Sequence, residues 1–298
     1  MSTEAVLYDH PGPRARLRNR ILTVVFGLVL LGLLYWVYAR FDAKGQWAAA
    51  LWKPFTQAST WTDYILPGLR HTLVAAAVAM VLSLAFGILF AVGRLSEHWW
   101  LRIPAGVVVE FFRAVPLLLL MFFIFFGVPF LTQQPMSIFW AVVIGLTLYN
   151  GSVLAEAFRA GVRAVPSGQS EAGYAIGLRK SQVMTLILLP QAVRAMLPAI
   201  VSQLVVLLKD TALGFIINYP ELLFVGKQIG GRLTFGLPYV PTYLIVAAIY
   251  IATCGLLSLL AYWLQRRLIR GKRPRTAAPP MPITMEPGSI GPTGSSVG

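Results

Sequence analysis

The sequence predicts an all-helical integral membrane protein. Of its 298 residues, 57% are apolar and only 12% are charged, and the mean hydropathy is +0.70. This composition matches hydrocarbon rather than water as the surrounding solvent. Six apolar runs are long enough to cross a hydrocarbon core of ~30 Å, which takes about 20 helical residues. These predicted spans are Ile21–Ala39, Leu69–Val92, Val107–Leu131, Ile138–Ala157, Ala192–Ile217 and Tyr243–Leu264.

The rest of the composition excludes several kinds of site. The single cysteine, Cys254, lies in an apolar run and the three histidines are scattered, so neither a disulfide framework nor a Cys/His metal site is expected. The net charge of +14 does not indicate nucleic-acid binding, because the basic residues lie between or beyond the apolar runs. They are expected to set the orientation in the membrane.

The first apolar run follows a basic segment, residues 1–20, which resembles the start of a signal peptide. However, the run exceeds the usual ~7–15 apolar residues and no convincing small-residue cleavage site follows it. Residues 21–39 are therefore predicted to remain as an extra N-terminal transmembrane helix. Residues 40–68 contain three tryptophans, which suit an outer loop at the membrane interface.

Lysines and arginines near the spans predict the orientation, because they are enriched in cytoplasmic loops. If the N-terminus is cytoplasmic, most of them lie inside, and both termini are expected there. Residues 265–298 begin with a basic cluster and continue as a stretch rich in Pro, Gly and Ser, which predicts a disordered tail. The basic residues then left outside are Arg40, Lys44, Lys53, Arg70, Lys227 and Arg232.

The cytoplasmic loop at residues 161–190 carries its own helix signals. A helix of two to three turns is predicted between Pro166 and Gly177, which suit a helix start and a helix end. Ser167 and Ser170 are expected to accept hydrogen bonds from free N–H groups at its start. Glu171 lies in the first turn, where the helix dipole favours a carboxylate. Small and apolar residues share one face and let another backbone approach: Ala172, Ala175 and Ile176.

A second helix is predicted to start at Ser181 and to reach Pro190. The next span is expected to begin at Pro190, because a proline in the first turn of a helix loses no hydrogen bond by lacking an N–H group. The loop has an alternative interpretation as an ordinary connection whose amphipathic helix rests on lipid headgroups. Composition and spacing alone leave both interpretations open.

The residues of this loop resemble the cytoplasmic signature of ABC importer permeases. Glu171-Ala172, then Gly177 four residues after Gly173, then Ile187-x-Leu189-Pro190 are similar to its EAA…G…I-LP pattern, with Gly173 where many members have a second alanine. The resemblance covers about residues 69–264, and within the family it is nearest to actinobacterial glutamate-uptake permeases. It extends to the polar amino-acid uptake family through "EFFRAVPLLLL", "AEAFRAGVRAVPSGQSEA" and "LPQAVRAMLPAIVSQLVVLLKDTALG".

This resemblance implies a type I ABC importer fold, with a five-helix core at 69–264 and a cytoplasmic coupling helix. The chain is expected to be a transport subunit rather than an enzyme and to bind no cofactor. ATP and magnesium are expected on two ATPase subunits, and the chain has no G-x-x-x-x-G-K-[ST] nucleotide motif. A second permease, related or identical, an extracytoplasmic binding protein and an amino acid, glutamate first, are the other expected partners. The expected ATPase-coupling residues are Glu171, Ala172, Tyr174 and Gly177.

Ionisable residues in the fifth predicted span indicate a substrate pathway, because charge at membrane depth is costly. Lys209 and Asp210 lie in its outer half, and Gln203, seven residues before Asp210, shares its face. Thr211 is assigned to the same pathway. The positions of Gln203 and Asp210 resemble those of a pair of carboxylates that lines the substrate site in relatives that carry cationic amino acids. The neutral Gln203 therefore favours an acidic or amide substrate.

Each ionisable residue has an expected role and an alternative. Asp210 is expected to meet the α-ammonium, Lys209 or Arg113 a carboxylate, and Gln203 the remainder of the substrate. Alternatively, Lys209 and Asp210 neutralise each other near the interface, and Arg113 anchors the cytoplasmic side or pairs with Glu110 at i−3.

Three classes of protein compete at this point. A self-contained, ion-coupled secondary transporter commonly has pseudo-symmetric halves, and this chain has no convincing repeat. A membrane enzyme or scaffold lacks support, because no nucleophile, paired-carboxylate or metal constellation lies at membrane depth. The permease of an ATP-driven importer is favoured, because it alone explains the capped cytoplasmic helix.

Overall fold

The computed structural model describes residues 12–270, with side chains described as far as Arg267. Residues 1–11 and 271–298 lie outside the described residues, and with them lies most of the predicted tail. Every described element is helical. The long helices are α1 (Pro13–Ala43), α3 (Leu66–Leu95), α7 (Ile138–Arg163), α10 (Leu189–Asp210) and α12 (Tyr239–Arg270).

Shorter helical elements connect the long ones. The short α-helices are α2 (Ala58–Thr60), α4 (Trp99–Ala114), α5 (Leu117–Phe122), α6 (Val128–Thr132), α8 (Ser167–Ala175), α9 (Lys180–Gln182) and α11 (Leu222–Gly230). The 3₁₀ and π segments are η2 (Ala49–Thr56), η3 (Trp61–Ile65), η4 (Phe123–Gly127), η5 (Val183–Leu188), η6 (Thr211–Ile217) and η7 (Leu233–Phe235).

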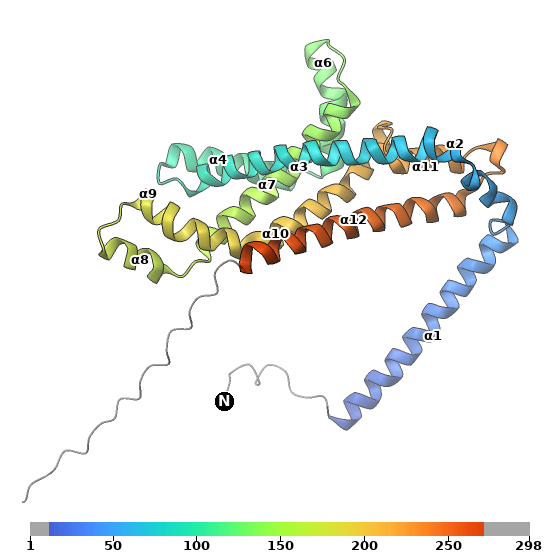
Figure 1. Cartoon of the computed structure of the whole chain (residues 1–298), viewed down its shortest axis with the longest axis horizontal. Coiled ribbons are helices and arrows are strands. Elements are labelled where there is room, and N and C mark those ends of the chain that lie inside the picture. Colours follow the sequence, from blue (N-terminus) through green and yellow to red (C-terminus); the bar gives the residue numbers. More distant parts are fainter. Residues whose placement is uncertain (1–11, 271–298) are drawn as a thin grey trace, which may run out of the picture.

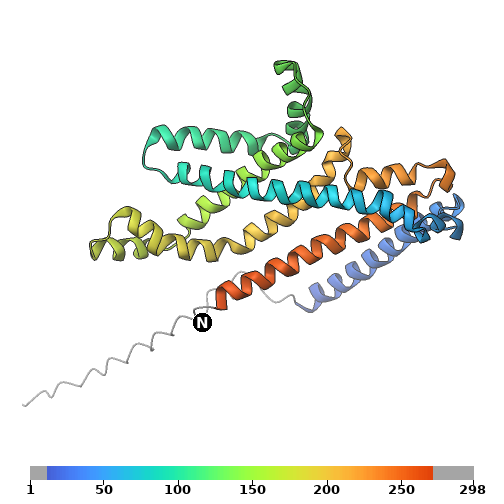
Figure 2. The same cartoon turned by 45° about the horizontal axis from the view of Figure 1, so that its top comes forward.

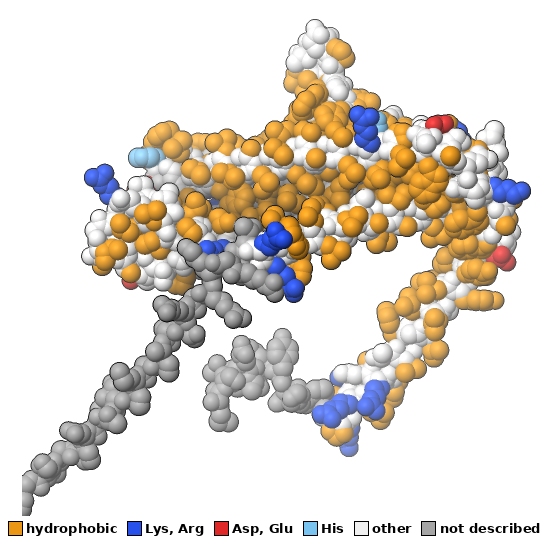
Figure 3. All heavy atoms as spheres, in the orientation of Figure 1, with side chains coloured by type: hydrophobic (Ala, Val, Ile, Leu, Met, Phe, Trp, Pro, Cys, Tyr) orange, Lys and Arg blue, Asp and Glu red, His pale blue; other side chains and the backbone are white. Residues whose placement is uncertain are grey.

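The helices α3, α7, α10 and α12 form an elongated bundle, with α8 and α9 at one end and α2 and α11 at the other (Figure 1). Helix α1 stands apart from the bundle in both views, and none of its residues is buried (Figures 1 and 2). Five helical segments of the described chain are long and apolar enough to cross a membrane, and a bent pair makes a sixth. Hydrophobic side chains cover the bundle face and α1, whereas Lys and Arg gather near helix ends (Figure 3).

The core of the bundle depends on small residues in α3. Helices α3 and α7 make the closest extended contact, and α3 buries alanine, serine and glycine along the face that meets α7. A Cβ atom on Gly87 would lie 2.9 Å from Cβ of Leu154, and one on Gly151 would lie 2.8 Å from the Phe86 ring. Small residues let the two backbones approach closely, which is how helices associate where lipid removes the hydrophobic drive.

The third predicted span is not one straight helix. The structure breaks it between α4 and the segment Leu117–Thr132, which meet at 101°. The break falls at Val115 and Pro116, whose ψ angles are 127° and 133°. A residue before proline avoids the helical region, and the proline donates no N–H, so the chain turns here. The segment α5–α6 then projects from the side of the bundle (Figures 1 and 2).

Three of the prolines that continue a helix share one backbone feature. Pro67, Pro129 and Pro190 each follow a π-turn, and in each case the carbonyl four residues earlier lies inside that turn. A proline crowds that carbonyl and leaves it without a donor, and a π-turn widens the backbone at that point. Pro190 lies in the first turn of α10, as expected, but α10 continues a longer helical rod that runs from Lys180 to Ile217.

The predicted outer loop at residues 40–68 is largely helical. It contains the end of α1, then η2, α2 and η3, and the start of α3. Trp47 stacks on Tyr38 with ring centroids 5.3 Å apart, which fixes the turn after α1. Gln46 accepts a hydrogen bond from the Val240 amide at 3.3 Å and so ties this turn to the start of α12.

Candidate transport site and coupling surface

A polar cluster joins α7 and α10 inside the bundle. Asn150, near the middle of α7, is fully buried, and its Oδ1 accepts a hydrogen bond of 2.7 Å from Nε2 of Gln203 on α10. Its Nδ2 donates to the Leu146 carbonyl at 3.2 Å. Asn150 also makes an electrostatic contact with the Asp210 carboxylate. Gln203 and Asp210 therefore face the same side of α10, as their spacing predicted.

The sequence pattern did not identify Asn150 as a candidate site residue. A single amide in the apolar run "AVVIGLTLYNGSVLA" produces no periodic signal, and its partner Gln203 lies 53 residues further along the chain. The available signal was its polarity within a predicted span, since polar groups at membrane depth are expensive and often functional. The cluster therefore contains two amides and one carboxylate.

The side chains of Lys209 and Asp210 lie on different sides of α10, although the Lys209 charge acts on the Asp210 carboxylate. Asp210 is turned toward α7, whereas the exposed side chain of Lys209 lines a groove between α10 and α12. Consecutive helical residues project about 100° apart, so neighbours in sequence can face different surroundings. The structure gives no ion pair between them within the described residues.

Thr211 belongs to a second polar cluster near α11. It is fully buried, and its hydroxyl donates to the Leu208 carbonyl at 2.7 Å. The neighbouring Tyr250 donates to Glu221 at 2.6 Å, and Glu221 also caps α11 by accepting from the amides of Leu223 and Phe224. Thr211 is therefore placed near α11 and apart from the Asn150 cluster, and its substrate role stays a prediction.

Glu221 is fully buried at the start of α11, and sequence reasoning did not single it out. Burial raises the pKa of this carboxyl above its ordinary value, against the lowering effect of its hydrogen bonds. Burial, and then the nearby Glu221 charge, raise the pKa of Tyr219 to about 12. The Tyr219 hydroxyl donates to the His71 carbonyl at 3.0 Å, so the segment before α11 is fastened to α3.

Arg113 lies in an ionic network instead of facing Asp210. Its guanidinium pairs with Glu110 at 3.3 Å, the i−3 contact that was the predicted alternative. Arg94, at the end of α3, pairs with both Glu110 and Glu156 at 3.0 Å, and Glu156 pairs with Arg159. The network thus connects α3, α4 and α7. A substrate contact for Arg113 stays a prediction.

The short helix α8 confirms the boundaries predicted for a helix in the loop at residues 161–190. It follows Pro166 and ends before Gly177, whose φ of +83° is the left-handed conformation that favours glycine. The amide of Leu178 donates to the Gly173 carbonyl at 3.1 Å, and the amide of Gly177 to the Tyr174 carbonyl at 2.9 Å. These two bonds form a Schellman C-cap.

The predicted serine caps are wrong. The helix begins at Ser167 itself, directly after Pro166, and no side chain caps its free N–H groups. Because Ser167 is already helical, it cannot occupy the capping position. Ser170 lies inside the first turn and donates its hydroxyl to the Ser167 carbonyl at 2.7 Å.

One face of α8 packs on the protein and the other is free. Gly173 is buried against Val183 and Ile187 of η5, and a Cβ atom there would lie 2.9 Å from each side chain. This contact leaves little room for a side chain at Gly173. The opposite surface is solvent-exposed and includes all four predicted coupling residues: Glu171, Ala172, Tyr174 and Gly177.

Comparison with known proteins decides which family this geometry represents. Residues 83–270, which contain the polar cluster, the ionic network and α8, match the family described as binding-protein-dependent transport system inner membrane component. The chain belongs to this family. Its members include ABC transporter permeases, which span the membrane while ATP is hydrolysed on a separate subunit.

Among curated relatives of this inner membrane component, a glutamate transport system permease protein, GluD, from Corynebacterium glutamicum is 42% identical over 78% of this chain and 84% of its own length. A probable glutamine ABC transporter permease, GlnP, from Bacillus subtilis is 36% identical over 68% of this chain and 93% of its own length. The chain is therefore an amino-acid ABC transporter permease and not an enzyme.

Solved structures of inner membrane components show the same fold. An amino-acid ABC transporter crystallised with histidines is 28% identical, with a TM-score of 0.64, over 70% of this chain and 95% of that chain. The MetNI methionine ABC transporter in an inward-facing conformation is 20% identical, with a TM-score of 0.57 over 71% of this chain, and supports the fold alone. The family assignment leaves no support for a self-contained secondary transporter.

Proposed function

We propose that this permease imports glutamate or a similar polar amino acid by alternating access. The observation that carries the proposal is the cluster of one carboxylate and two amides, Asp210, Gln203 and Asn150, on the facing sides of α7 and α10. Asp210 supplies the charge for an α-ammonium group, and the amides supply donors and acceptors for the rest of the substrate. The glutamate permease relative supports the choice of glutamate.

The proposed complex contains four further chains. A second permease, related or identical, completes the pore, and two ATPase subunits hold ATP and magnesium. An extracytoplasmic binding protein delivers the amino acid. The exposed surface of α8 is the proposed ATPase contact. The proposal therefore places the α8 end of the bundle and both chain termini on the cytoplasmic side of the membrane. Closure of the ATPases then changes the exposure of the pathway through α8.

The test is uptake by the complete complex, purified from native membranes and reconstituted in vesicles with ATP inside. Wild-type complex is expected to accumulate labelled glutamate when its binding protein is present outside. Asp210→Asn is expected to lower uptake by at least tenfold, while complex yield and membrane insertion stay within twofold. Unchanged uptake by Asp210→Asn would remove Asp210 from the substrate site, and accumulation of no amino acid by the wild type would overturn the proposed function.

A further inference from the structure

Helix α10 separates two different polar environments. Asp210 faces Asn150 of α7, whereas Lys209 points into the groove between α10 and α12. The groove consists of two cavities of about 640 and 680 Å³, and Lys209 lines both. The lysine therefore stands in the middle of one continuous groove, on a different side of α10 from the Asn150 cluster.

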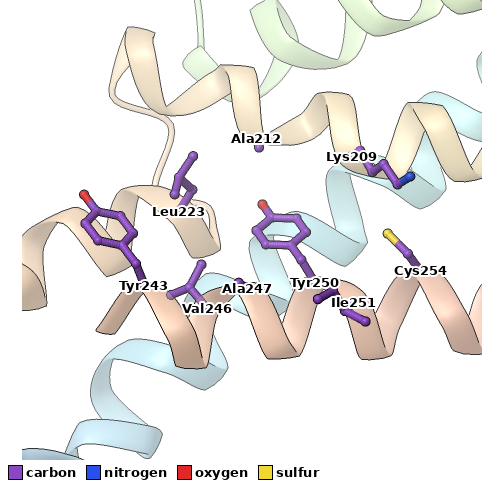
Figure 4. A pocket seen from close by; sticks show the side chains of 9 residues that line it. All are labelled: Lys209, Ala212, Leu223, Tyr243, Val246, Ala247, Tyr250, Ile251 and Cys254. Carbon is purple, nitrogen blue, oxygen red and sulfur yellow. The ribbon is translucent and has the colours of Figure 1, made fainter. Parts of the chain in front are cut away.

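The walls of the groove around Lys209 are mostly apolar. Figure 4 shows the lysine above α12, with its amine directed along the groove toward Cys254 and away from Tyr243 near the start of α12. The other side chains near it include Ala212, Leu223, Val246, Ala247, Tyr250 and Ile251.

Within the described part of the chain, Lys209 forms no ion pair with a carboxylate, although its charge acts on the neighbouring Asp210. Among the described residues, no Asp or Glu oxygen lies within 4.0 Å of its amine. A lysine at membrane depth is costly unless an anion or water meets it. Helix α1, which has no buried residue, contains no acidic side chain before Asp42 near its C-terminal end.

We infer that the groove is a second substrate subsite, in which Lys209 binds a carboxylate of the passing amino acid. The inference rests on the proposed function and adds a second binding position for the substrate along the transport pathway. Asp210 and the two amides hold the substrate on the α7 side of α10, and Lys209 holds an anionic end on the α12 side. The carboxylate is either the α-carboxylate, which all amino-acid substrates share, or the side chain of an acidic amino acid.

Cys254 makes the groove testable, because it lines the groove and is the only cysteine of the chain. The intact reconstituted complex is treated with membrane-impermeant methanethiosulfonates, one anionic and one cationic, and the Cys254 peptide is quantified by mass spectrometry. Wild type is expected to react faster with the anionic reagent, by roughly tenfold, because a nearby cation concentrates anions. Lys209→Gln is expected to remove this preference, and Lys209→Arg to retain it. Added substrate is expected to slow both reactions.

Two outcomes overturn the subsite. Reaction only with a neutral, membrane-permeant maleimide means that the groove faces lipid. Absence of reaction with every reagent in the intact complex means that another chain covers it. Either result stands even when wild-type vesicles accumulate glutamate, so failure of the subsite is distinct from failure of the proposed function.

Uptake by Lys209→Gln identifies the carboxylate. If Lys209 binds the α-carboxylate, uptake of glutamate and glutamine falls by a similar factor, on the order of tenfold. If it binds the side chain, glutamate uptake falls while glutamine uptake stays near the wild-type rate. Unchanged uptake of both, with labelling also insensitive to Lys209, overturns the inference.

Discussion

The hydroxyl of Tyr250 donates a 2.6 Å hydrogen bond to the fully buried carboxylate of Glu221. This bond joins α12 to the first residue before α11, and the same carboxylate accepts the amides of Leu223 and Phe224. Three donors converge on one buried anion. The Glu221 side chain thus ties the start of α11 to α12, in addition to the apolar packing of α11 in the bundle.

Replacing Glu221 is expected to change the pH dependence of stability. Burial raises its pKa above 4.5 in the folded protein, so the folded state holds this proton more tightly than the unfolded state. The resulting stabilisation is complete below about pH 4.5 and is lost as pH rises through the folded-state pKa. The difference in melting temperature between wild type and Glu221→Gln is expected to shrink over that range.

The measurement is thermal unfolding in detergent from pH 4.5 upward. Glu221→Gln is also expected to cost roughly 1–3 kcal/mol at low pH, because both oxygens of a protonated carboxyl can still accept hydrogen bonds, whereas the NH₂ group of the amide cannot. Tyr250→Phe removes one donor and serves as the control. A pH-independent difference between wild type and Glu221→Gln would contradict the raised pKa.

Gly177→Asp is expected to uncouple transport from ATP hydrolysis while the protein stays inserted. The φ of +83° makes any side chain there cost about 1 kcal/mol, and aspartate adds a charge at the proposed ATPase contact. Gly177→Asn is the matched control, because it carries the same strain without the charge. Detergent extraction followed by mass spectrometry should lose the ATPase from the aspartate variant only. Normal uptake by Gly177→Asp would remove α8 from the coupling surface.

Gly173→Ala is expected to push α8 away from η5. The new Cβ would lie 2.9 Å from Val183 and Ile187, and the branched Val183 has little room to rotate. The expected cost is on the order of 1–3 kcal/mol, the range for overpacking a close contact. Gly168→Ala, in the same helix with open space around it, is the control. Equal melting temperatures for both variants would show that the contact yields freely.

Arg94 and Arg113 are expected to differ in their effect on stability. Arg94 is 13% exposed and bridges two carboxylates on different helices, whereas Arg113 is 36% exposed and pairs within its own helix. Arg94→Gln should cost about 2–4 kcal/mol and Arg113→Gln less than about 1 kcal/mol. Melting temperatures in detergent check the order. Lost uptake by a stable Arg113→Gln variant would favour its predicted substrate contact.

Gln203→Glu is expected to shift selectivity toward cationic amino acids. A second carboxylate beside Asp210 repels an acidic side chain and attracts a basic one, so glutamate uptake should fall and arginine uptake rise, each by roughly tenfold. Gln203→Met, which removes the bond to Asn150 without adding charge, is the control. Equal effects of the two variants on glutamate and arginine would separate Gln203 from side-chain selection.

Local signals made α8 predictable. Pro166 and Gly177 act through their own backbone angles, so its ends could be placed within a residue or two without knowledge of the packing. The shared face of Gln203 and Asp210 followed in the same way from helical spacing. The serine caps were predicted wrongly because a capping residue must come directly before the first helical residue. That position belongs to Pro166, and Ser167 is already inside the helix.

Features that depend on distant partners could not be predicted. Asn150 acquires its role from Gln203, and Glu221 is buried only because α3 and α12 close around the start of α11. The 101° bend at Pro116 lay inside an apolar run whose composition suits either one straight span or two short helices. In each case packing between different segments decides the structure. The spacing of residues within one segment carries no information about that packing.

The π-turn η5 lies where α8 packs onto the rod that leads to Asp210. Helices kink at such turns more readily than along regular stretches. A push on α8 is therefore delivered to the most compliant point of that rod. We expect α8 and the short segment Lys180–Gln182 to move together about η5, while α10 stays straight and keeps the Gln203–Asp210 face in shape.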